Sequence, residues 1–419
     1  MLALLGILLA LLAFNGMPLF AVFGALAMAL FYAEGVDISS VAVSMYSVAS
    51  SPLLVAIPLF TLAGYLFAHS KAPDRLVNLS RALFPGGLAV VALVACAVFT
   101  AFTGASGVTI VAMGGLLLPA LLREGYNRKF SLGLVTASGS LGLLFPPSLP
   151  IIIYGYVASV QIDKLFLAGI LPGILLLGLL AGYGWYKGRK EGIQSPPHSM
   201  AAIKSAVRAA AWEIPLPVIV LGGIYGGFIT VQEAAALTAL YALIVEVFIY
   251  RDIPVRKLPE IFAESTSLVG GILVIIMCSF GFVNYLIDAE VPMRILAWMQ
   301  HYISSKYTFL LILNLFLLVV GCLMDIFSAL IVVVPLIAPV AVGFGVDPVH
   351  LGIVFLTNLE IGYLTPPVGL NLFISSFRFK EPVVKLYSAS VPFLLLMLLA
   401  LVIITYAPAL SLALVHLVK

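Results

Sequence analysis

Charged residues are scarce in this 419-residue chain. Asp, Glu, Lys and Arg make up only 9% of the residues, whereas 63% are hydrophobic and the mean hydropathy is +1.20. A soluble globular protein needs more polar surface than this, so the composition predicts an all-α polytopic membrane protein whose main partner is the lipid bilayer. The net charge of +3 is too small to indicate nucleic acid as a partner.

Motifs for metal binding, nucleotide hydrolysis and nucleophilic catalysis are also missing. Cys96, Cys278 and Cys322 lie far apart in apolar runs, and no two of the five histidines have the spacing of metal ligands. The chain has no phosphate-binding loop, so it does not hydrolyse ATP itself. Asp325 and Glu360 are a carboxylate pair without an accompanying nucleophile, which argues against an intramembrane hydrolase. The sequence predicts no enzyme activity, no cofactor and no metal other than a coupling Na⁺.

Long apolar runs, in contrast, fill the chain. A transmembrane helix needs about 20 apolar residues, which predicts spans near residues 2–32, 48–68, 130–158, 165–186, 209–229, 233–249, 260–287, 350–376 and 387–416. Residues 2–32 are too long for a signal sequence and are interpreted as a retained first span. Two longer runs, about 84–122 and 307–345, are each either two full crossings or a re-entrant hairpin.

The basic residues orient this map, because cytoplasmic loops attract Lys and Arg. If the N-terminus is cytoplasmic, 17 of the 21 basic residues fall in cytoplasmic loops. The C-terminus then lies on the outer side. The run at 84–122 opens from the cytoplasm and the run at 307–345 opens from the outside.

Glycine and proline recur at matching places in the two halves. A shift of about 220 positions places Gly142 on Gly362 and the double proline Pro146-Pro147 on Pro366-Pro367. Broken helices at membrane depth are tolerated only beside protein or a water-filled cavity, and a matched pair of them marks a transporter's binding site. We therefore expect inverted repeats at 1–200 and 231–419, a linker span at 201–230, two hairpins, and broken helices at 130–158 and 350–376. Residues 73–82 and 292–303 are expected to form interfacial arm helices.

The hairpin turns and the broken helices together predict two Na⁺ sites, since their carbonyl and hydroxyl oxygens suit a hard cation. Candidates for the first site are Gly104, Ser106, Ser138, Ser140, Gly142 and Pro146; candidates for the second are Gly321, Asp325, Gly362 and Thr365. Asp325 carries most weight, because a carboxylate at mid-membrane costs about 2.5–3.5 kcal/mol. A second interpretation, compatible with the first, is that Asp325 caps the returning helix.

An anionic substrate is expected between the helix N-termini at the two hairpin turns. Candidates for lining its cavity are Thr109, Tyr154, Asn358, Glu360 and Asn371. For Asn358 and Glu360, a structural hydrogen bond between helices is an equally good interpretation. Glu233, near the outer end of a span, is expected to cap its helix.

Several motifs resemble those of one transporter family. Pro146-Pro-Ser-Leu-Pro-Ile-Ile-Ile-Tyr154, Leu165-Phe-Leu-Ala-Gly-Ile-Leu-Pro-Gly173 and Thr365-Pro-Pro-Val-Gly-Leu-Asn-Leu-Phe373 occur in order along the chain. They resemble the large membrane subunit (M subunit, DctM-like) of the tripartite ATP-independent periplasmic, or TRAP, transporters. Two stretches depart from the family pattern: Thr230-Val-Gln-Glu233 lacks the usual proline, and the turn at 103–107 is less rich in serine.

The resemblance implies an elevator-type, Na⁺-driven importer in the bacterial cytoplasmic (inner) membrane. The implied partners are a small membrane subunit of the Q type and a soluble periplasmic substrate-binding protein of the P type. The implied substrates are organic acids such as a C4-dicarboxylate, a sugar acid or sialic acid. The alternative is a self-sufficient ion-coupled carboxylate transporter of the same superfamily that needs no binding protein; a channel is disfavoured because inverted broken helices indicate alternating access.

Overall fold

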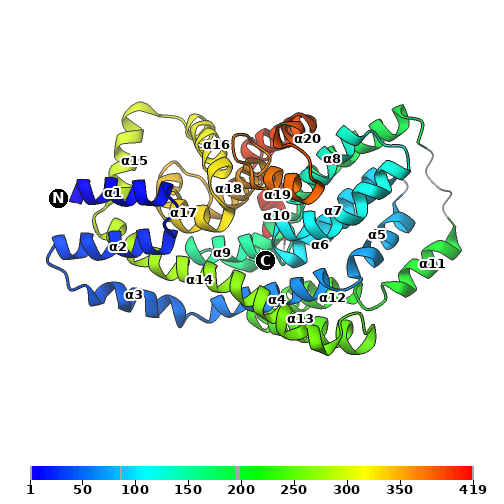
Figure 1. The fold of residues 1–419 in the computed structure, drawn as a ribbon. Helices are drawn as coiled ribbons and strands as arrows, with labels where there is room; N and C mark the ends of the chain where they lie inside the picture. The colour runs from blue at the N-terminus through cyan, green and yellow to red at the C-terminus, as the bar shows by residue number, and fades with distance from the viewer. Residues whose placement is uncertain (1, 85–86, 194–198, 418–419) are drawn as a thin grey trace.

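Every regular element in the described part of the chain, residues 2–84, 87–193 and 199–417 of a computed structural model, is a helix (Figure 1). The first repeat and its N-terminal extension contain α1 Leu2–Phe14, α2 Leu19–Ala33, α3 Ser39–Ala49, α4 Ala56–Ala68, α5 Ala72–Leu83, α6 Gly87–Thr103, α7 Ser106–Arg123, α8 Arg128–Ser138, α9 Leu149–Val157 and α10 Ile162–Lys190. The linker and the second repeat contain α11 Met200–Ala209, α12 Pro215–Tyr225, α13 Val231–Leu243, α14 Leu258–Asp288, α15 Val291–Tyr302, α16 Lys306–Leu323, α17 Ile326–Gly343, α18 Pro348–Gly362, α19 Leu370–Phe379, α20 Val383–Tyr406 and α21 Ala409–Leu417. Among the described residues, seven helices are long and apolar enough to cross a membrane, or eight if the bent pair α3–α4 is one span.

The two halves repeat the same series of elements about 220 residues apart. An arm helix (α5 or α15) is followed by a hairpin (α6–α7 or α16–α17), a broken helix (α8–α9 or α18–α19) and a long span (α10 or α20). In each half the hairpin's second helix ends at a glycine with positive φ, Gly125 and Gly345, a conformation that a residue with a Cβ rarely adopts. The repeated order of elements expected from the sequence is confirmed, and α5 and α15 occupy the positions expected for the arm helices.

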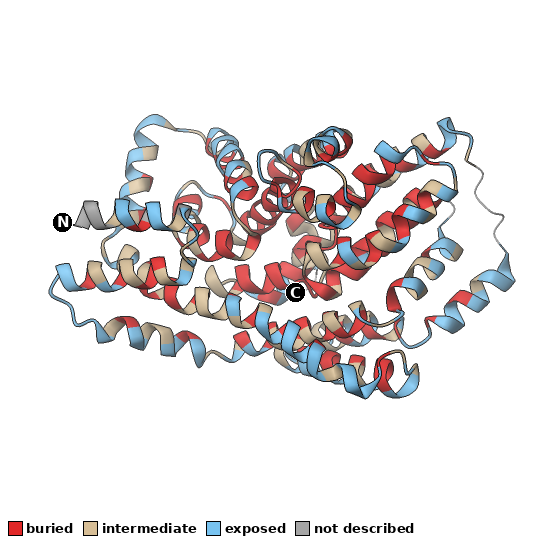
Figure 2. Ribbon diagram, in the orientation of Figure 1, coloured by how far each residue is buried: buried red, intermediate tan, exposed pale blue. Residues whose placement is uncertain are grey.

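The repeats interlock through symmetric pairs of contacts. In the second hairpin, α17 packs against α9 of the first repeat, and in the first hairpin α7 packs against α19 of the second. The long spans do the same, because α20 packs against α8 and α10 packs against α18. In Figure 2 buried residues concentrate on the hairpins and the broken helices; α8 is buried from Phe130 to Ser138 and α18 from His350 to Gly362. We call this unit, α6–α10 and α16–α20, the central unit.

Both hairpins end inside the membrane rather than crossing it. A Cβ added to Gly142, in the break between α8 and α9, would meet the Ala97 carbonyl oxygen of α6 at 2.3 Å. A Cβ on Gly362, at the break between α18 and α19, would meet Gly321 of α16 at 2.4 Å. Because the breaks lie midway along spanning helices, the hairpin tips that contact them lie near mid-depth. Hairpins of this kind are re-entrant.

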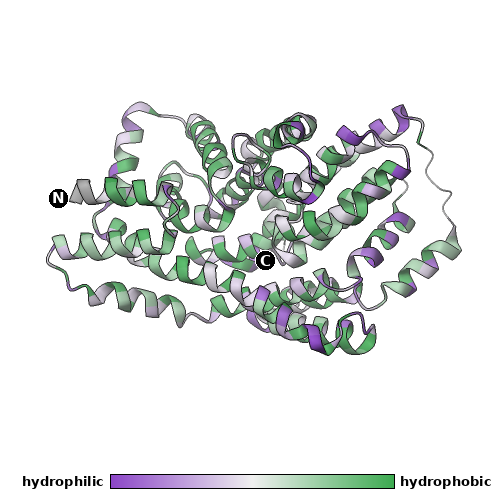
Figure 3. Ribbon diagram, in the orientation of Figure 1, coloured by the Kyte–Doolittle hydropathy of each residue, from purple (hydrophilic) through white to green (hydrophobic). Residues whose placement is uncertain are grey.

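The remaining long helices form a second group, which we call the frame. Helix α14 packs against α2, α3 and α4, and α13 packs against α4. Glu233 completes a capping box at the start of α13: Thr230 Oγ1 accepts from the Glu233 N–H, while the carboxylate accepts from the Thr230 N–H. Hydrophilic residues gather on the arm helices and at the ends of spans (Figure 3). The frame is therefore apolar where lipid is expected.

Residues 2–32 do not form the single span that the sequence predicts. They form two short helices, α1 and α2, which pack against each other and are joined by a turn at Asn15 to Pro18, with Gly16 at φ +94° (Figure 1). Proline cannot continue α1, and Gly16 supplies the left-handed turn. The cytoplasmic N-terminus, which was inferred from one crossing, therefore no longer follows.

Two other spans also differ from the prediction. The linker span expected at 209–229 is represented by α12, which has only 11 residues and follows a separate short helix, α11. The last span, expected at 387–416, is divided at Pro408 into α20 and α21. Pro215 starts α12 and the pair Gly226-Gly227 ends it, so the chain's own helix-breaking residues set these limits. Between these halves, residues 187–190 belong to α10 and residues 200–208 to α11, and residues 194–198 lie outside the described part.

Candidate functional site

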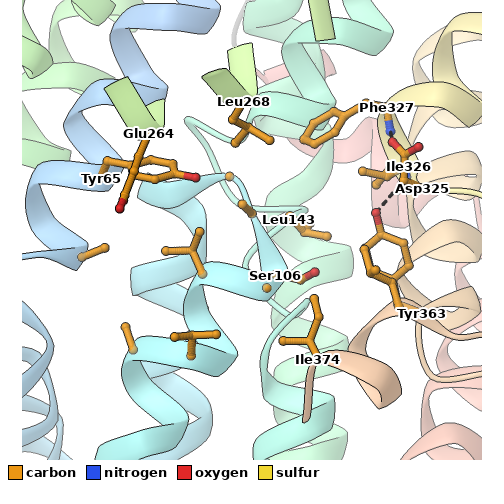
Figure 4. A pocket seen from close by; sticks show the side chains of 18 of the residues that line it. Tyr65, Ser106, Leu143, Glu264, Leu268, Asp325, Ile326, Phe327, Tyr363 and Ile374 are labelled. Carbon is orange, nitrogen blue, oxygen red and sulfur yellow. Dashed lines mark hydrogen bonds between the residues drawn. The ribbon is translucent and has the colours of Figure 1, made fainter. Parts of the chain in front are cut away.

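The two hairpin tips and the frame enclose a cavity of about 780 Å³ (Figure 4). Hairpin 1 contributes the turn from Gly104 to Val108, and hairpin 2 contributes Asp325, Ile326 and Phe327. Frame helices α4 and α14 form the opposite wall, and α19 with Tyr363 lines the side. The cavity thus lies between the central unit and the frame.

The turn of hairpin 1 contains a glycine, Gly104. Gly104 has φ +63°, and a Cβ there would meet the Leu149 side chain at 2.6 Å, so both backbone and space require glycine. Behind the turn, Thr100 Oγ1 lies 2.7 Å from Thr109 Oγ1 and 3.1 Å from the Gly139 carbonyl oxygen. These contacts tie the hairpin to the break of α8–α9. Helix α7 begins at Ser106, so its N-terminus faces the cavity.

The turn of hairpin 2 contains a carboxylate, that of Asp325. Asp325 Oδ1 accepts hydrogen bonds from the N–H groups of Phe327 and Ser328, both at 3.0 Å, and Ser328 Oγ donates to Oδ2. The Ile326 N–H donates to the Tyr363 hydroxyl at 2.8 Å, as Figure 4 shows. Asp325 is therefore the N-cap of α17, which confirms the capping interpretation. Its side chain is only partly buried and lines the cavity, so the cap also places a negative charge there.

The candidates for each Na⁺ site are gathered at their own hairpin. In the first set, Gly104 and Ser106 line the cavity, while Ser138 Oγ donates to the Val135 carbonyl at 3.0 Å and Ser140 Oγ is buried without a partner among the described residues. Pro146, in cis linkage with Pro147, is partly buried in the same break.

In the second set, Gly321 and Gly362 meet backbone to backbone beside Asp325. Thr365 Oγ1 donates to the Ile361 carbonyl at 3.0 Å. The Gly369 N–H donates to the Cys322 carbonyl at 3.2 Å, which links the unwound segment to the hairpin tip. Among the described residues no cluster of His, Cys, Asp or Glu has the form of a metal site.

Five residues were proposed from the sequence to line a substrate cavity. None of them lines the cavity at the hairpin tips in this structure. The Thr109 hydroxyl faces Thr100, and the Tyr154 hydroxyl donates to the Pro348 carbonyl at 2.8 Å. Asn358 donates to Asn314 Oδ1 of α16 at 2.8 Å. Asn371 donates to the Thr136 carbonyl at 3.4 Å, and Glu360 is fully buried. The four with hydrogen-bond partners contact other segments of the central unit. The sequence shows that they are embedded, but not which face of each helix meets the cavity.

Four polar or ionisable side chains of the cavity lining were not identified from the sequence. Tyr65 and His69 come from α4, Glu264 from α14, and Tyr363 from the second break. His69 Nε2 lies 2.9 Å from Glu264 Oε2. Glu264 was detectable as an acidic residue near the start of an otherwise apolar span. Tyr65 and Tyr363 carried no signal beyond their neighbours, because aromatic residues are common at membrane interfaces and in packed cores.

The cavity lining contains acidic side chains, which is unusual for a site expected to bind an anion. Its lining includes the carboxylates of Asp325 and Glu264, whereas no lysine or arginine among the described residues lines it. His69 is paired with Glu264. The positive potential comes from the N-termini of α7 and α17, each equivalent to about half a charge. The two carboxylates outnumber these partial positive charges in the cavity lining.

A family model describes nearly the whole chain. The DctM component of the tripartite ATP-independent periplasmic transporters matches residues 5–410. This chain belongs to that family. Its members are transporter permease subunits and not enzymes, in agreement with the chain's missing catalytic motifs.

Curated relatives support the same family over similar lengths. The C4-dicarboxylate TRAP transporter large permease protein DctM of Rhodobacter capsulatus is 37% identical, over 98% of each chain. The isethionate TRAP transporter permease protein DctMQ of Oleidesulfovibrio alaskensis is 36% identical, over 94% of this chain and 63% of the relative. The ectoine/5-hydroxyectoine TRAP transporter large permease protein UehC of Ruegeria pomeroyi is 34% identical, over 86% of this chain and 85% of the relative.

A solved structure shares the fold. The YdaH transporter of Alcanivorax borkumensis superposes with a TM-score of 0.64 over 88% of this chain and 87% of its own, at 14% sequence identity. At that identity the likeness concerns architecture alone. The DctM-family chain therefore has an architecture found in another solved transporter.

Proposed function

We propose that this TRAP permease is a Na⁺-coupled, binding-protein-dependent secondary importer of organic acids. The observation that carries the proposal is the cavity between the two hairpin tips, with a helix N-terminus and candidate cation ligands at each tip. The expected substrate is a C4-dicarboxylate, a sugar acid or sialic acid. Relatives named for C4-dicarboxylate, isethionate and ectoine show that family membership alone leaves the substrate open.

The charge of the cavity supports coupling to a cation. Two carboxylates and no lysine or arginine line it, so an anionic substrate alone meets repulsion. A Na⁺ ion at each hairpin tip adds two positive charges and reverses the sign of that interaction. Occupied cation sites would thus raise the affinity for an anion, and the reverse holds by linkage. This mutual dependence is what couples a substrate to an ion gradient.

The arrangement of the two units supports an elevator mechanism. The hairpins and broken helices interlock into the central unit, whereas the frame contacts the cavity through α4 and α14. Sliding the central unit past the frame would carry the cavity from one side of the membrane to the other. Arm helices α5 and α15 connect frame to hairpin in each repeat, where a hinge is needed.

The proposed partners are a Q-type small membrane subunit and a P-type soluble periplasmic binding protein, in the bacterial inner membrane. The Lys and Arg bias places the loop after α4 in the cytoplasm. The C-terminus then lies on the periplasmic side. The start of α18 lies beside the base of hairpin 2, and His350 Nδ1 in its first turn is 3.2 Å from Ser411 Oγ of α21. The cavity, next to His69, opens toward the cytoplasm.

The direct test is uptake of radiolabelled organic acids into proteoliposomes that hold this chain and its small subunit. Four conditions combine the presence or absence of the cognate binding protein with an imposed or collapsed Na⁺ gradient. We expect accumulation only when both are present. Uptake with Na⁺ alone would indicate the self-sufficient transporter instead, and uptake without Na⁺ would reject the coupling.

A further inference from the structure

A small apolar groove lies beside arm helix α5, away from the cavity at the hairpin tips. Its volume is about 220 Å³, which is less than the roughly 300–1,000 Å³ of a pocket for a drug-sized molecule. Its walls come from α4, α5, hairpin helix α6 and the connector between α11 and α12. Glu213 is the one charged residue among the described residues that line it, and Arg75 already pairs with this carboxylate. The groove therefore presents hydrocarbon to whatever enters it.

The groove has a buried floor and an exposed rim. Phe99 of α6 and Leu216 of α12 are almost fully buried, whereas Val98 and Ile214 are each 37% exposed. Because α6 belongs to a hairpin inside the membrane, the rim around Val98 faces lipid. A polar ligand would find few hydrogen-bond partners on this lining, and burying polar groups without partners is costly. A hydrocarbon chain matches both the lining and the location.

Helix α11 packs against α5 and has an exposed apolar edge (Figure 1). Ala206 is buried, but Met200 is 78% exposed and Val207, two turns further along the same side, is exposed as well. Trp212 follows the helix and is also exposed. Tryptophan is common where a membrane protein meets the lipid headgroups. An amphipathic helix with such an edge is typical of a segment that lies at the membrane surface.

The same side of α11 carries two basic side chains. Lys204 and Arg208 lie one turn apart, beside the edge formed by Met200 and Val207, and both are exposed. Neither forms an ion pair with any residue that the structure describes. Residues 187–208 contain five basic residues and a single acidic one. A basic stretch on an amphipathic helix next to a membrane span indicates an anionic lipid headgroup as its partner.

The connector fixes this basic edge next to the groove. Helix α11 ends at Ala209, and four residues later Glu213 begins the groove wall. The Tyr250 hydroxyl lies 2.7 Å from the Ala209 carbonyl oxygen and 3.0 Å from Glu213 Oε2. The Trp212 N–H donates to the same hydroxyl at 3.3 Å. The two features thus share one short, hydrogen-bonded segment, as the headgroup and chain sites of a single lipid require.

We propose that the groove and the basic edge of α11 together bind one anionic phospholipid. One acyl chain occupies the groove, and the phosphate lies beside Lys204 and Arg208. Arginine suits this role because its guanidinium can donate two parallel hydrogen bonds to a phosphate. The site lies on the same face as the loop after α4, because α11 packs on α5, which follows that loop. The bound lipid contacts both the arm α5 and hairpin helix α6. This site is independent of the transported substrate and of the coupling ion.

Native mass spectrometry of the delipidated complex with its small subunit tests the headgroup site. Phosphatidylglycerol and phosphatidylcholine with identical acyl chains are titrated separately. We expect phosphatidylglycerol to bind about tenfold or more tightly than phosphatidylcholine, and the double variant Lys204→Gln, Arg208→Gln to remove this preference. Gln is a good helix former and both positions are exposed, so the variant should fold. Equal affinity of the wild type for the two lipids overturns the proposal.

A matched double variant controls for general electrostatic attraction. Arg256→Gln with Lys257→Gln removes two exposed basic residues from the segment before α14. That segment lies on the same face, since the Lys71 N–H donates to Asp252 at 3.1 Å. This variant should keep the phosphatidylglycerol affinity within about twofold of wild type. Equal losses in the two double variants would show attraction by the whole face and no site at α11, which contradicts the proposal.

The acyl-chain site is tested by filling the groove. Val98→Phe enlarges a side chain at the rim and should lower the phosphatidylglycerol affinity by about tenfold, with an unchanged melting temperature. Leu116→Phe is the control, because Leu116 is similarly exposed on α7 of the same hairpin and does not line the groove. Glycerol phosphate, which has no acyl chains, should not displace the lipid. Unchanged affinity in Val98→Phe, or displacement by glycerol phosphate, would indicate a simple anion site and overturn the lipid assignment. None of these measurements uses transport, so failure of Na⁺-coupled import would not affect them.

Discussion

At the scale of single residues, Asp325 combines two roles that substitution can separate. Its Oδ1 caps α17, and its charge faces the cavity. Asn is as good an N-cap as Asp but carries no charge, whereas Ala provides neither a cap nor a charge. The cap accounts for why hairpin 2 tolerates a carboxylate at mid-membrane. The charge accounts for why a cation is expected there.

We predict that Asp325→Asn reduces Na⁺-driven uptake at limiting Na⁺ by about tenfold or more, the loss of about 1.4 kcal/mol of cation binding. Its melting temperature should stay close to that of wild type. Asp325→Ala should also lose about 0.5–2 kcal/mol of stability with the cap. Uptake with unchanged Na⁺ dependence in the Asn variant would show that Asp325 is a cap only.

The sequence identified the residues of the hairpins and breaks, but not which of them face the cavity. Gly142, Gly362 and Asp325 were detectable because Gly, Pro and Asp are costly in a membrane helix and recur or stand alone there. Tyr154 and Asn371 do not line the cavity at the hairpin tips, because the face that a helical residue presents depends on its neighbours. That information appears only once α9 is packed on α17 and α19 on α7.

At the scale of elements, α5 is more than an interfacial arm. Its Arg75 is nearly buried and binds three carboxylates: Nε donates to Glu213, and the two terminal nitrogens donate to Asp252 and Glu246. The Tyr250 ring lies 3.9 Å from the guanidinium carbon. This cluster fixes the arm to the frame near the end of the α13 span. Its members lie up to 177 residues apart in sequence, which is why the sequence did not reveal it.

We predict that Arg75→Ala destabilises the protein by about 3–5 kcal/mol, since it leaves buried carboxylates unpaired. Thermal unfolding of the purified complex should show a melting temperature lower by several degrees. Arg81→Ala is the matched control on the same helix: its pair with Glu124 is largely exposed, so its loss should cost less than about 1 kcal/mol. Equal effects of the two substitutions would show that the cluster does not hold the arm.

The N-terminal hairpin shows the limit of hydropathy at this scale. Residues 2–33 contain no charge, so one long span and two short helices have the same apolar signal. The turn signal was present in Asn15-Gly-Met-Pro18, but it is weak inside a long apolar run. The hairpins at 84–122 and 307–345 were easier to interpret, because a second copy of each pattern supports the first.

At the scale of the whole molecule, the fold consists of two inverted repeats whose helices pack against each other. The hairpin tips of both repeats line one cavity. This arrangement accounts for the offset of about 220 residues, for the paired double prolines and for the hairpin tips that meet at the cavity wall. The proposed transport cycle requires this cavity to face each side of the membrane in turn. In the present structure His69 and Glu264 line this cavity, and the proposed orientation puts the loop after α4 in the cytoplasm.

Thiol accessibility tests that claim most directly. Val108→Cys, on the cavity wall of hairpin 1, is introduced into a protein whose three native cysteines are replaced, and an impermeant maleimide is added from either side. We predict modification from the cytoplasmic side at rest, and from the periplasmic side only when Na⁺ and substrate drive turnover. Phe228→Cys, at an exposed turn of the linker, should react from one side throughout. Reaction of Val108→Cys from a single side under every condition would contradict alternating access by this cavity.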